Sequence, residues 1–199
     1  MLIMRGPGGF EGGRVIDPMV SHVDLLPTIC ELTGIDKPEW LEGESLMPLV
    51  RGEQERIREE TFAELNFHAS YDPQRAVRTE RWKYIRRFDH NLRRRLANCD
   101  ESLSKDLWLE HGWSHENQRP EHELYDLIFD PQERHNLADE PAHAEVLRDM
   151  QQRLDDWMQR TDDPIRQGHI PIPDHLQIMV NPVDSPNPNE KPVPWSKTQ

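Results

Sequence analysis

The clearest hydrophobic pattern in the chain lies toward its C-terminal end. Between residues 140 and 162, apolar side chains recur at steps of three and four residues, the spacing that places them on one face of a helix. They are Leu147, Met150, Leu154 and Trp157. Pro141 stands near the start of the segment and Pro164 beyond its end, where a helix tolerates proline. The pattern therefore predicts a long amphipathic helix over residues 140–162.

Alternation of apolar and polar residues predicts strands in the middle of the chain. Residues 61–65 and 123–127 alternate, and two short segments, 76–79 and 82–86, carry β-branched and aromatic side chains. Glu80 and Arg81 separate these two segments, so a tight hairpin is expected there. Together with the final helix, these strands predict an α+β fold: a small antiparallel sheet packed against one long C-terminal helix.

A shorter helix is predicted nearer the N-terminus, over residues 19–32. Its apolar positions, three or four residues apart, are Met19, Val23, Leu26, Ile29 and Cys30. Ser21 and Asp24 have the spacing of a capping pair, and Gly34 stands where a helix commonly ends. Because Pro27 would interrupt a helix interior, the helix either runs through it or begins beside it after a turn. The apolar residues 2–5, followed by a glycine-rich turn, predict a short strand.

The remaining segments are polar, which divides the chain into three regions. The charged stretch 53–60 suggests a boundary, residues 91–121 resemble an insertion-like loop with at most a short helix, and prolines crowd the chain beyond residue 164. The predicted regions are therefore 1–55, 56–165 and a proline-rich extended tail, 166–199. The apolar runs reach only three or four residues, too few for a bilayer span of about 20 or for an export signal. We expect no membrane partner and no signal peptide within these residues, and the compartment is left open.

Charge narrows the range of partners. The chain has 24 basic and 37 acidic residues, a net charge of −13, which disfavours binding to nucleic acid and to anionic membranes. Residues 75–95 are the exception, because they contain nine basic residues and two acidic ones. The run Arg93–Arg95 within them is either a polyanion patch or a solvated face, and charge runs are more often the latter. Any polyanion site is expected in this segment.

The residues that could hold a metal do not form a recognisable set. Cys30 and Cys99 have neither a disulfide framework nor zinc spacing, so they are expected to be unpaired thiols. His22 and Asp24 would diverge on a helix, which favours a capping role for Asp24 over metal binding. His111 and His115 are four residues apart, a spacing that can chelate zinc, but no third ligand is evident. The sequence predicts no metal site.

Several motifs resemble one enzyme family when they are taken in order. The N-terminal motifs are the run Val20-Ser21-His22-Val23-Asp24-Leu25-Leu26-Pro27-Thr28-Ile29, Gly34-Ile35 and residues 41–49. The later ones are Arg75-Ala76-Val77-Arg78-Thr79, Trp82-Lys83-Tyr84-Ile85, Glu123-Leu124-Tyr125-Asp126-Leu127, Asp130-Pro131 and Asn136-Leu137-Ala138. From residue 2 to about 165, the chain resembles the C-terminal part of sulfatases, which belong to the alkaline phosphatase-like superfamily. Within that family it is most similar to the N-sulfoglucosamine sulfohydrolase (heparan N-sulfatase) group and its bacterial relatives.

The resemblance implies a fold and a chemistry. Residues 1–55 would be the final strand and helix of an incomplete α/β sulfatase catalytic domain, poorly stabilised without the sheet that they should cover. The full-length enzyme would remove sulfate esters or N-sulfates from sulfated carbohydrate with calcium and a formylglycine matured from a Cys/Ser-x-Pro-x-Arg motif. Neither Cys30 nor Cys99 lies in such a motif. This chain is therefore expected to supply no catalytic residue and no metal ligand, and to be inactive alone.

The family also implies substrate-binding residues at the loop after the first strand of the C-terminal subdomain. In order of preference these are Arg75, His68 and Glu64, since arginine and histidine can donate to anionic oxygens. The alternative is that they are loop residues facing water or satisfying a backbone turn, while Arg78 and Lys83 form cross-strand ion pairs with Glu80 or neighbouring acids. At the level of function, the alternatives are a noncatalytic remnant or a module that binds a polyanion or a partner. That partner would be a missing N-terminal half or a second copy, and a phosphoesterase of the same superfamily is a less favoured third reading.

Overall fold

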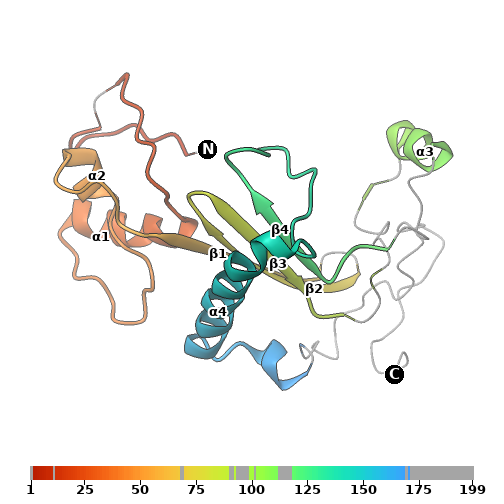
Figure 1. Cartoon of the computed structure of the whole chain (residues 1–199). Helices are drawn as coiled ribbons and strands as arrows, with labels where there is room; N and C mark the ends of the chain where they lie inside the picture. The colour runs from red at the N-terminus through yellow and green to blue at the C-terminus, as the bar shows by residue number, and fades with distance from the viewer. Residues whose placement is uncertain are drawn as a thin grey trace, which may run out of the picture. The chain divides into compact units, whose positions relative to one another are not determined.

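The fold was analysed in a computed structural model, which describes residues 2–10, 12–67, 70–89, 92, 99–100, 102–111, 118–168 and 170. The chain forms two compact units, Met1–Thr61 and Phe62–Gln199. Figure 1 shows the elements of both units along the chain. The predicted three-part division at residues 55 and 165 stays a prediction.

Unit 1, Met1–Thr61, contains a 3-10 turn and two helices: η1 (His22–Asp24), α1 (Leu25–Thr33) and α2 (Met47–Arg51). The predicted capping is confirmed: the Ser21 backbone N–H donates to Asp24 Oδ2 at 2.7 Å, and Gly34 ends α1 with φ 71°. Pro27 is the third residue of α1, in the first turn, where the backbone nitrogens have no partner within the helix. The segment 19–32 is thus a turn followed by a helix, but the helix begins at Leu25 and not at Pro27, where the second of the two predicted forms placed its first residue.

The strand predicted over residues 2–5 is wrong for this structure. These residues are irregular, and the nearby pairing is a single bridge between Gly6 and Phe10. A strand needs a neighbour to accept and donate its backbone hydrogen bonds. No described segment of unit 1 pairs with residues 2–5 in this way, so their apolar side chains alone do not make a strand.

Unit 2 is built on a four-stranded sheet in the order β1-β2-β3-β4. The strands are β1 (Glu60–Phe67), β2 (Tyr71–Thr79), β3 (Trp82–Arg87) and β4 (His122–Asp126), and both β2/β3 and β3/β4 are antiparallel. The predicted hairpin is confirmed, since Arg78 pairs with Lys83 and the Trp82 N–H donates to Thr79 Oγ1 across the turn. β2 begins five residues earlier than predicted. Pro73 argues against a strand in the sequence pattern, but the strand continues through it.

The long helix confirms the strongest sequence prediction. A 3-10 turn, η3 (Pro141–His143), leads into α4 (Ala144–Arg160), and η4 (Pro164–Gln167) follows. α4 lies across one face of the sheet and contacts β2 and β3 (Figure 1). Met150 and Leu154 are fully buried, and Leu147 and Trp157 pack at the edge of the same core. The core also includes Met158, Val77, Tyr84, Leu124, Ile165 and Ile170.

The predicted insertion-like loop contains one short described helix, α3 (Leu103–Glu110), which Ser102 caps by accepting the Lys105 N–H at 3.2 Å. Its apolar side chains Leu103, Leu107 and Trp108 are exposed. Trp113 and the chain after residue 170 lie outside the described residues. None of the helices in the described ranges combines the length and apolar character that crossing a bilayer requires.

Candidate functional site

Two of the three residues predicted to bind substrate lie on neighbouring strands of the sheet. Glu64 is on β1, an edge strand, and its side chain is 57% exposed. Arg75 is on β2, the next strand, and its side chain is 0% exposed. The Arg75 Nη2 and the Glu64 Oε2 are 3.7 Å apart, so the structure brings these two residues together. His68 lies outside the described residues.

Arg75 uses its guanidinium within the protein. Nε and Nη2 donate to the two oxygens of Asp163 at 2.5 and 2.9 Å, and Nη1 donates to the carbonyls of Leu65 and Gln74 at 3.2 and 3.0 Å. A guanidinium has five N–H groups, so these bonds leave one, on the nitrogen that faces Glu64. Arg75 therefore ties β1, β2 and the segment after α4 into one buried cluster.

Asp163 is placed for this pairing by the end of α4. It caps η4 by accepting the Ile165 N–H at 3.0 Å and is itself 4% exposed. Burial disfavours its charged form, but the hydrogen bonds from Arg75 and from the Ile165 backbone outweigh burial and hold the pKa of Asp163 below its usual value. The pair is thus a charged, bidentate contact inside the protein.

These contacts bear on the predicted substrate-binding roles. The proposed contact of Arg75 with an anion stays a prediction, and the arginine has a buried carboxylate as its partner in this structure. Glu64 is the one of the two described candidates whose side chain reaches solvent. Asp163 was not among the predicted site residues. It lies 88 positions after Arg75 along the chain, and only the fold brings the two side chains together.

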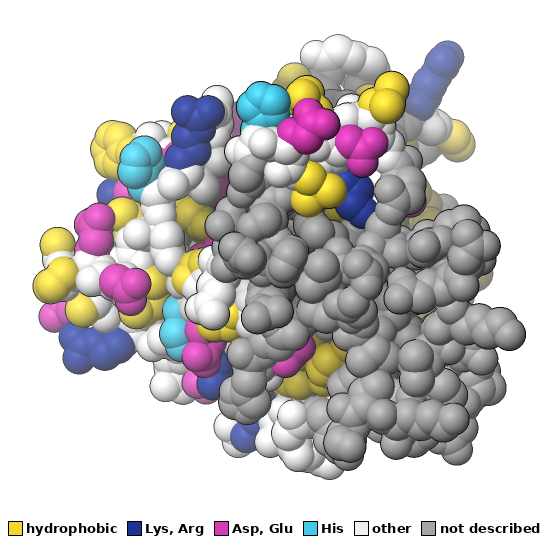
Figure 2. All heavy atoms as spheres, turned by 90° about the vertical axis from the view of Figure 1, so that its right-hand side faces the viewer, with side chains coloured by type: hydrophobic (Ala, Val, Ile, Leu, Met, Phe, Trp, Pro, Cys, Tyr) yellow, Lys and Arg dark blue, Asp and Glu magenta, His cyan; other side chains and the backbone are white. Residues whose placement is uncertain are grey.

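Most cations of the basic segment 75–95 that lie on β2, on β3 or in the turn between them contact a carboxylate. Besides Arg75, four of its cations contact carboxylates within 3.5 Å: Arg81 with Asp126, Lys83 with Glu133, Arg86 with Asp155 and Arg87 with Glu123. On the face drawn in Figure 2, basic side chains of the described residues are scattered among acidic and hydrophobic ones rather than gathered into a patch. The run Arg93–Arg95 lies outside the described residues. Lys83 forms an ion pair as expected, but its partner at 2.7 Å is Glu133, which follows β4 and is not on a neighbouring strand.

A second buried pair closes the base of the insertion. Arg119 donates to both oxygens of Asp72 at 2.9 and 2.6 Å, and its backbone N–H donates to the Leu92 carbonyl at 2.7 Å. The chain thus leaves and re-enters the sheet beside the start of β2. Sequence reasoning missed this pair because its members are 47 residues apart.

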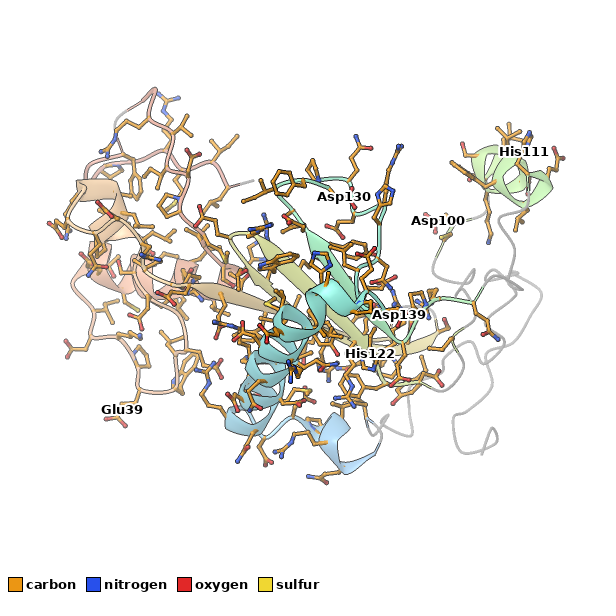
Figure 3. All side chains as sticks on the ribbon, viewed as in Figure 1. Glu39, Asp100, His111, His122, Asp130 and Asp139 are labelled. Atoms are coloured by element: carbon orange, nitrogen blue, oxygen red, sulfur yellow. The ribbon has the colours of Figure 1, made fainter. Side chains whose placement is uncertain are left out.

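A tyrosine and a histidine meet on the sheet without forming a catalytic base. The Tyr84 hydroxyl on β3 lies 2.7 Å from His122 Nδ1 on β4, and Figure 3 shows His122 there. Burial raises the pKa of Tyr84 to about 12. At neutral pH the side chain is therefore a neutral phenol and part of the core.

Unit 1 holds a buried carboxylate, Asp24, that is fully engaged. Its oxygens accept from the backbone of Ser21 and of Glu44, the latter at 3.0 Å, and from Arg58 Nη2. Thr28 extends the cluster by donating to the Asp24 carbonyl at 2.6 Å and accepting the Leu46 N–H at 2.9 Å. His22 is exposed while Asp24 is buried, so the two diverge as predicted.

The opposite face of α1 is apolar and exposed. Val23, Leu26, Ile29 and Leu32 follow one another at steps of three residues and are each 39 to 52% exposed. The buried face carries Asp24, Pro27, Thr28 and Cys30 instead. Large exposed apolar areas usually mark an interface.

The described residues do not fit a calcium ion or a formylglycine. Across the described parts of the chain, no group of three or more His, Cys, Asp or Glu side chains is placed to hold a metal. The His111 Nδ1 lies 2.9 Å from the Leu107 carbonyl at the end of α3 (Figure 3), and His115 is outside the described residues. Neither Cys30 nor Cys99 is part of a disulfide, and neither lies in a Cys-x-Pro-x-Arg motif.

Comparison with known proteins places the chain among sulfatases. An ulvan-active sulfatase of Formosa agariphila is 27% identical over 86% of this chain and 35% of its own length. A delta 4,5-hexuronate-2-O-sulfatase of Bacteroides thetaiotaomicron is 30% identical over 82% of this chain and 29% of its own length. The chain thus spans about a third of the length of these relatives.

Solved structures agree with this grouping. A 2-O GAG sulfatase matches with a TM-score of 0.54 and 27% identity, over 87% of this chain and 31% of that one. A phosphonate monoester hydrolase of Agrobacterium radiobacter matches with a TM-score of 0.50 and 22% identity, over 73% of this chain and 26% of that one, which shows a shared fold alone. The model of the family described as N-sulphoglucosamine sulphohydrolase, C-terminal, matches residues 1–101, half of the chain. The chain therefore belongs to the sulfatase family, in its N-sulphoglucosamine sulphohydrolase C-terminal group.

Proposed function

We propose that this chain is the C-terminal portion of a sulfatase that removes sulfate from sulfated carbohydrate. It contributes residues to the substrate cleft and does not contribute the nucleophile. Sulfate esters and N-sulfates are the substrate class, in keeping with relatives named for ulvan and for a 2-O-sulfated hexuronate. The chain spans about a third of those relatives, so the reaction belongs to a larger assembly than residues 1–199.

The exposed apolar stripe of α1 is the observation that carries this proposal. A helix in an α/β domain covers a sheet with its apolar face. In unit 1 that face, formed by Val23, Leu26, Ile29 and Leu32, is exposed, and the polar cluster around Asp24 holds the helix from the other side. We infer that the stripe is covered by a sheet of the catalytic domain that the described residues do not supply.

The calcium ion and the formylglycine of the family would then be held by that other portion. The contribution of this chain is the edge of the cleft, where Glu64, His68 and Arg75 are the proposed substrate-binding residues. Glu64 supports this role best, since its carboxylate is exposed beside a fully buried arginine.

The second candidate is a noncatalytic module that binds a polyanion or a partner protein. The apolar stripe favours a protein partner, either an N-terminal half or a second copy of the chain. Pairwise neutralisation of the cations on β2 and β3 argues against a polyanion site there. A phosphoesterase activity is less favoured, because the relatives above 25% identity are named sulfatases.

Two measurements test the proposal. The purified chain, incubated with a chromogenic aryl sulfate and calcium, should show no turnover, and measurable turnover would mean that these residues do contain a nucleophile. On a heparin column the chain should elute at low salt, whereas retention that weakens steadily with salt would favour the polyanion module. An aryl phosphate assayed in parallel serves as the control for phosphoesterase activity.

A further inference from the structure

We propose that Glu64 is a specificity-determining residue that binds a hydroxyl or ammonium group of the sugar, and that the buried Arg75–Asp163 pair positions it. This inference rests on the proposed function and refines it. It gives Glu64 the contact with substrate and makes Arg75 and Asp163 positioning residues, which act through Glu64 without touching the ligand.

The first step concerns the charged side chains of Glu64 on β1 and Arg75 on β2. Arg75 is 0% exposed and bound to both oxygens of Asp163, while Glu64 presents a half-exposed carboxylate beside it. A carboxylate and a sulfate group both accept hydrogen bonds and both carry negative charge. Glu64 is therefore unsuited to a sulfate group and suited to O–H or N–H donors of the sugar ring.

The second step concerns how Glu64 is held. Arg75 Nη1 donates to the carbonyl of Leu65, the residue directly after Glu64, and Arg75 Nη2 lies 3.7 Å from the Glu64 carboxylate. One buried guanidinium thus fixes the main chain next to Glu64 and attracts its side chain. Because β1 is an edge strand, this support comes from β2 on one side only.

The third step concerns Asp163. It binds Arg75 through two parallel hydrogen bonds, a geometry that fixes the plane of the guanidinium as well as its position. Without the carboxylate, the guanidinium would keep only the Nη1 bonds to the Leu65 and Gln74 carbonyls, and it would lose the charged contact that holds Nε and Nη2. The order of action is therefore Asp163 on Arg75, Arg75 on Glu64, and Glu64 on the sugar.

The ligand specificity is tested by NMR on the intact 199-residue chain labelled with nitrogen-15. The chain is titrated separately with methyl glucosaminide, which offers hydroxyl and ammonium donors, and with sodium sulfate, which offers none. Methyl glucosaminide should shift the amide signals of Glu64 and its neighbours, and sulfate at equal ionic strength should not. E64Q should weaken the sugar affinity about tenfold, as expected for one charge-assisted hydrogen bond.

The positioning role is tested by D163N with D72N as its matched control. Each change removes the carboxylate charge from a buried bidentate arginine pair, but Asp72 pairs with Arg119 rather than with Arg75. D163N should weaken methyl glucosaminide binding by roughly the same tenfold as E64Q, while D72N should bind as the unchanged chain does. If D163N does not fold, R75K replaces it in this test, because lysine keeps the positive charge but cannot form the two parallel hydrogen bonds to Asp163.

A double variant separates positioning from general loosening of the fold. If Asp163 acts through Glu64, E64Q combined with D163N should bind no more weakly than E64Q alone. Losses that multiply, or an equal loss in D72N, would overturn the positioning role. Sugar-induced shifts that E64Q leaves unchanged would overturn the Glu64 contact alone, whereas no sugar-induced shift at all would contradict the proposed cleft contribution itself.

Discussion

The two units differ in which side chains they bury and which they leave exposed. Unit 2 buries an apolar core between α4 and the sheet, with Met150, Leu154 and Val77 nearly inaccessible. Unit 1 also buries apolar side chains, those of Leu46, Met47, Leu49 and Val50, but the polar Asp24 and Thr28 lie inside as well and the apolar stripe of α1 faces outward. Since apolar burial is the main driving force of folding, unit 1 leaves part of its apolar surface without a stabilising contact, whereas the apolar face of α4 in unit 2 is covered by the sheet.

The strongest test of this contrast removes the same side chain atoms from each unit. Leu154→Ala deletes a fully buried side chain from the core of unit 2 and should lower the free energy of unfolding by about 2–5 kcal/mol. The matched change, Leu26→Ala, removes a half-exposed side chain from α1 and should change it by less than about 0.5 kcal/mol. Urea titration followed by tryptophan fluorescence measures both, and similar losses would contradict the contrast.

A change at Gly43 should loosen unit 1 without affecting unit 2. A Cβ at this position would lie 1.9 Å from the Val23 carbonyl, a backbone atom that cannot turn aside. Gly43→Ala should therefore push residue 44 away from η1, break the Glu44 N–H bond to Asp24, and cost about 1–3 kcal/mol locally. Hydrogen exchange should accelerate in α1 and stay unchanged in α4. Gly12→Ala, at a site with no atom within 4 Å, is the control.

Acid should weaken unit 2 through Asp163. The pKa of this buried carboxyl is below its unfolded value, so its contribution to stability is complete above about pH 4 and is lost as pH falls through the lower folded value. The free energy of unfolding should therefore drop on acidification below about pH 4. The drop should be shallower in Asp163→Asn, which has no carboxyl to protonate, and an unchanged slope would show that other groups carry it.

The smallest effect on stability, and the most direct on the interface, is expected from charges on the α1 stripe. Leu26→Glu with Ile29→Glu should leave thermal unfolding of unit 2 unchanged, since both side chains are about half exposed. The same variant should bind less of a hydrophobic dye and self-associate less at high concentration. A dye response equal to that of the unchanged chain would mean that the dye binds to another apolar surface and not to the stripe.

The sequence could predict the elements whose signals are local. The helix over 140–162, the 80–81 hairpin and the Ser21–Asp24 capping all depend on residues within a few positions of each other, and the structure confirms them. The strand predicted at residues 2–5 failed for the opposite reason, because a strand exists only beside a partner.

The orientation of α1 and the partners of Arg75 were not predictable in the same way. Periodicity identifies the apolar face of a helix but not whether the same chain covers it, and the polar face of α1 is buried by residues 43–58. The Arg75–Asp163 contact joins positions far apart in sequence, so charge alone suggested a free arginine where the fold provides a carboxylate. The substrate-binding roles of Arg75, His68 and Glu64 remain predictions.

The separation of Arg75 and Asp163 by 88 positions along the chain has a consequence for biosynthesis. At a ribosomal rate of about 5–20 residues per second, the arginine is made roughly 4–18 s before its carboxylate exists. During that interval the hairpin of β2 and β3 can form, but the Arg75 guanidinium has no Asp163 carboxylate to pair with. Nascent chains of this protein are therefore expected to need a waiting period, or a chaperone, before unit 2 can close.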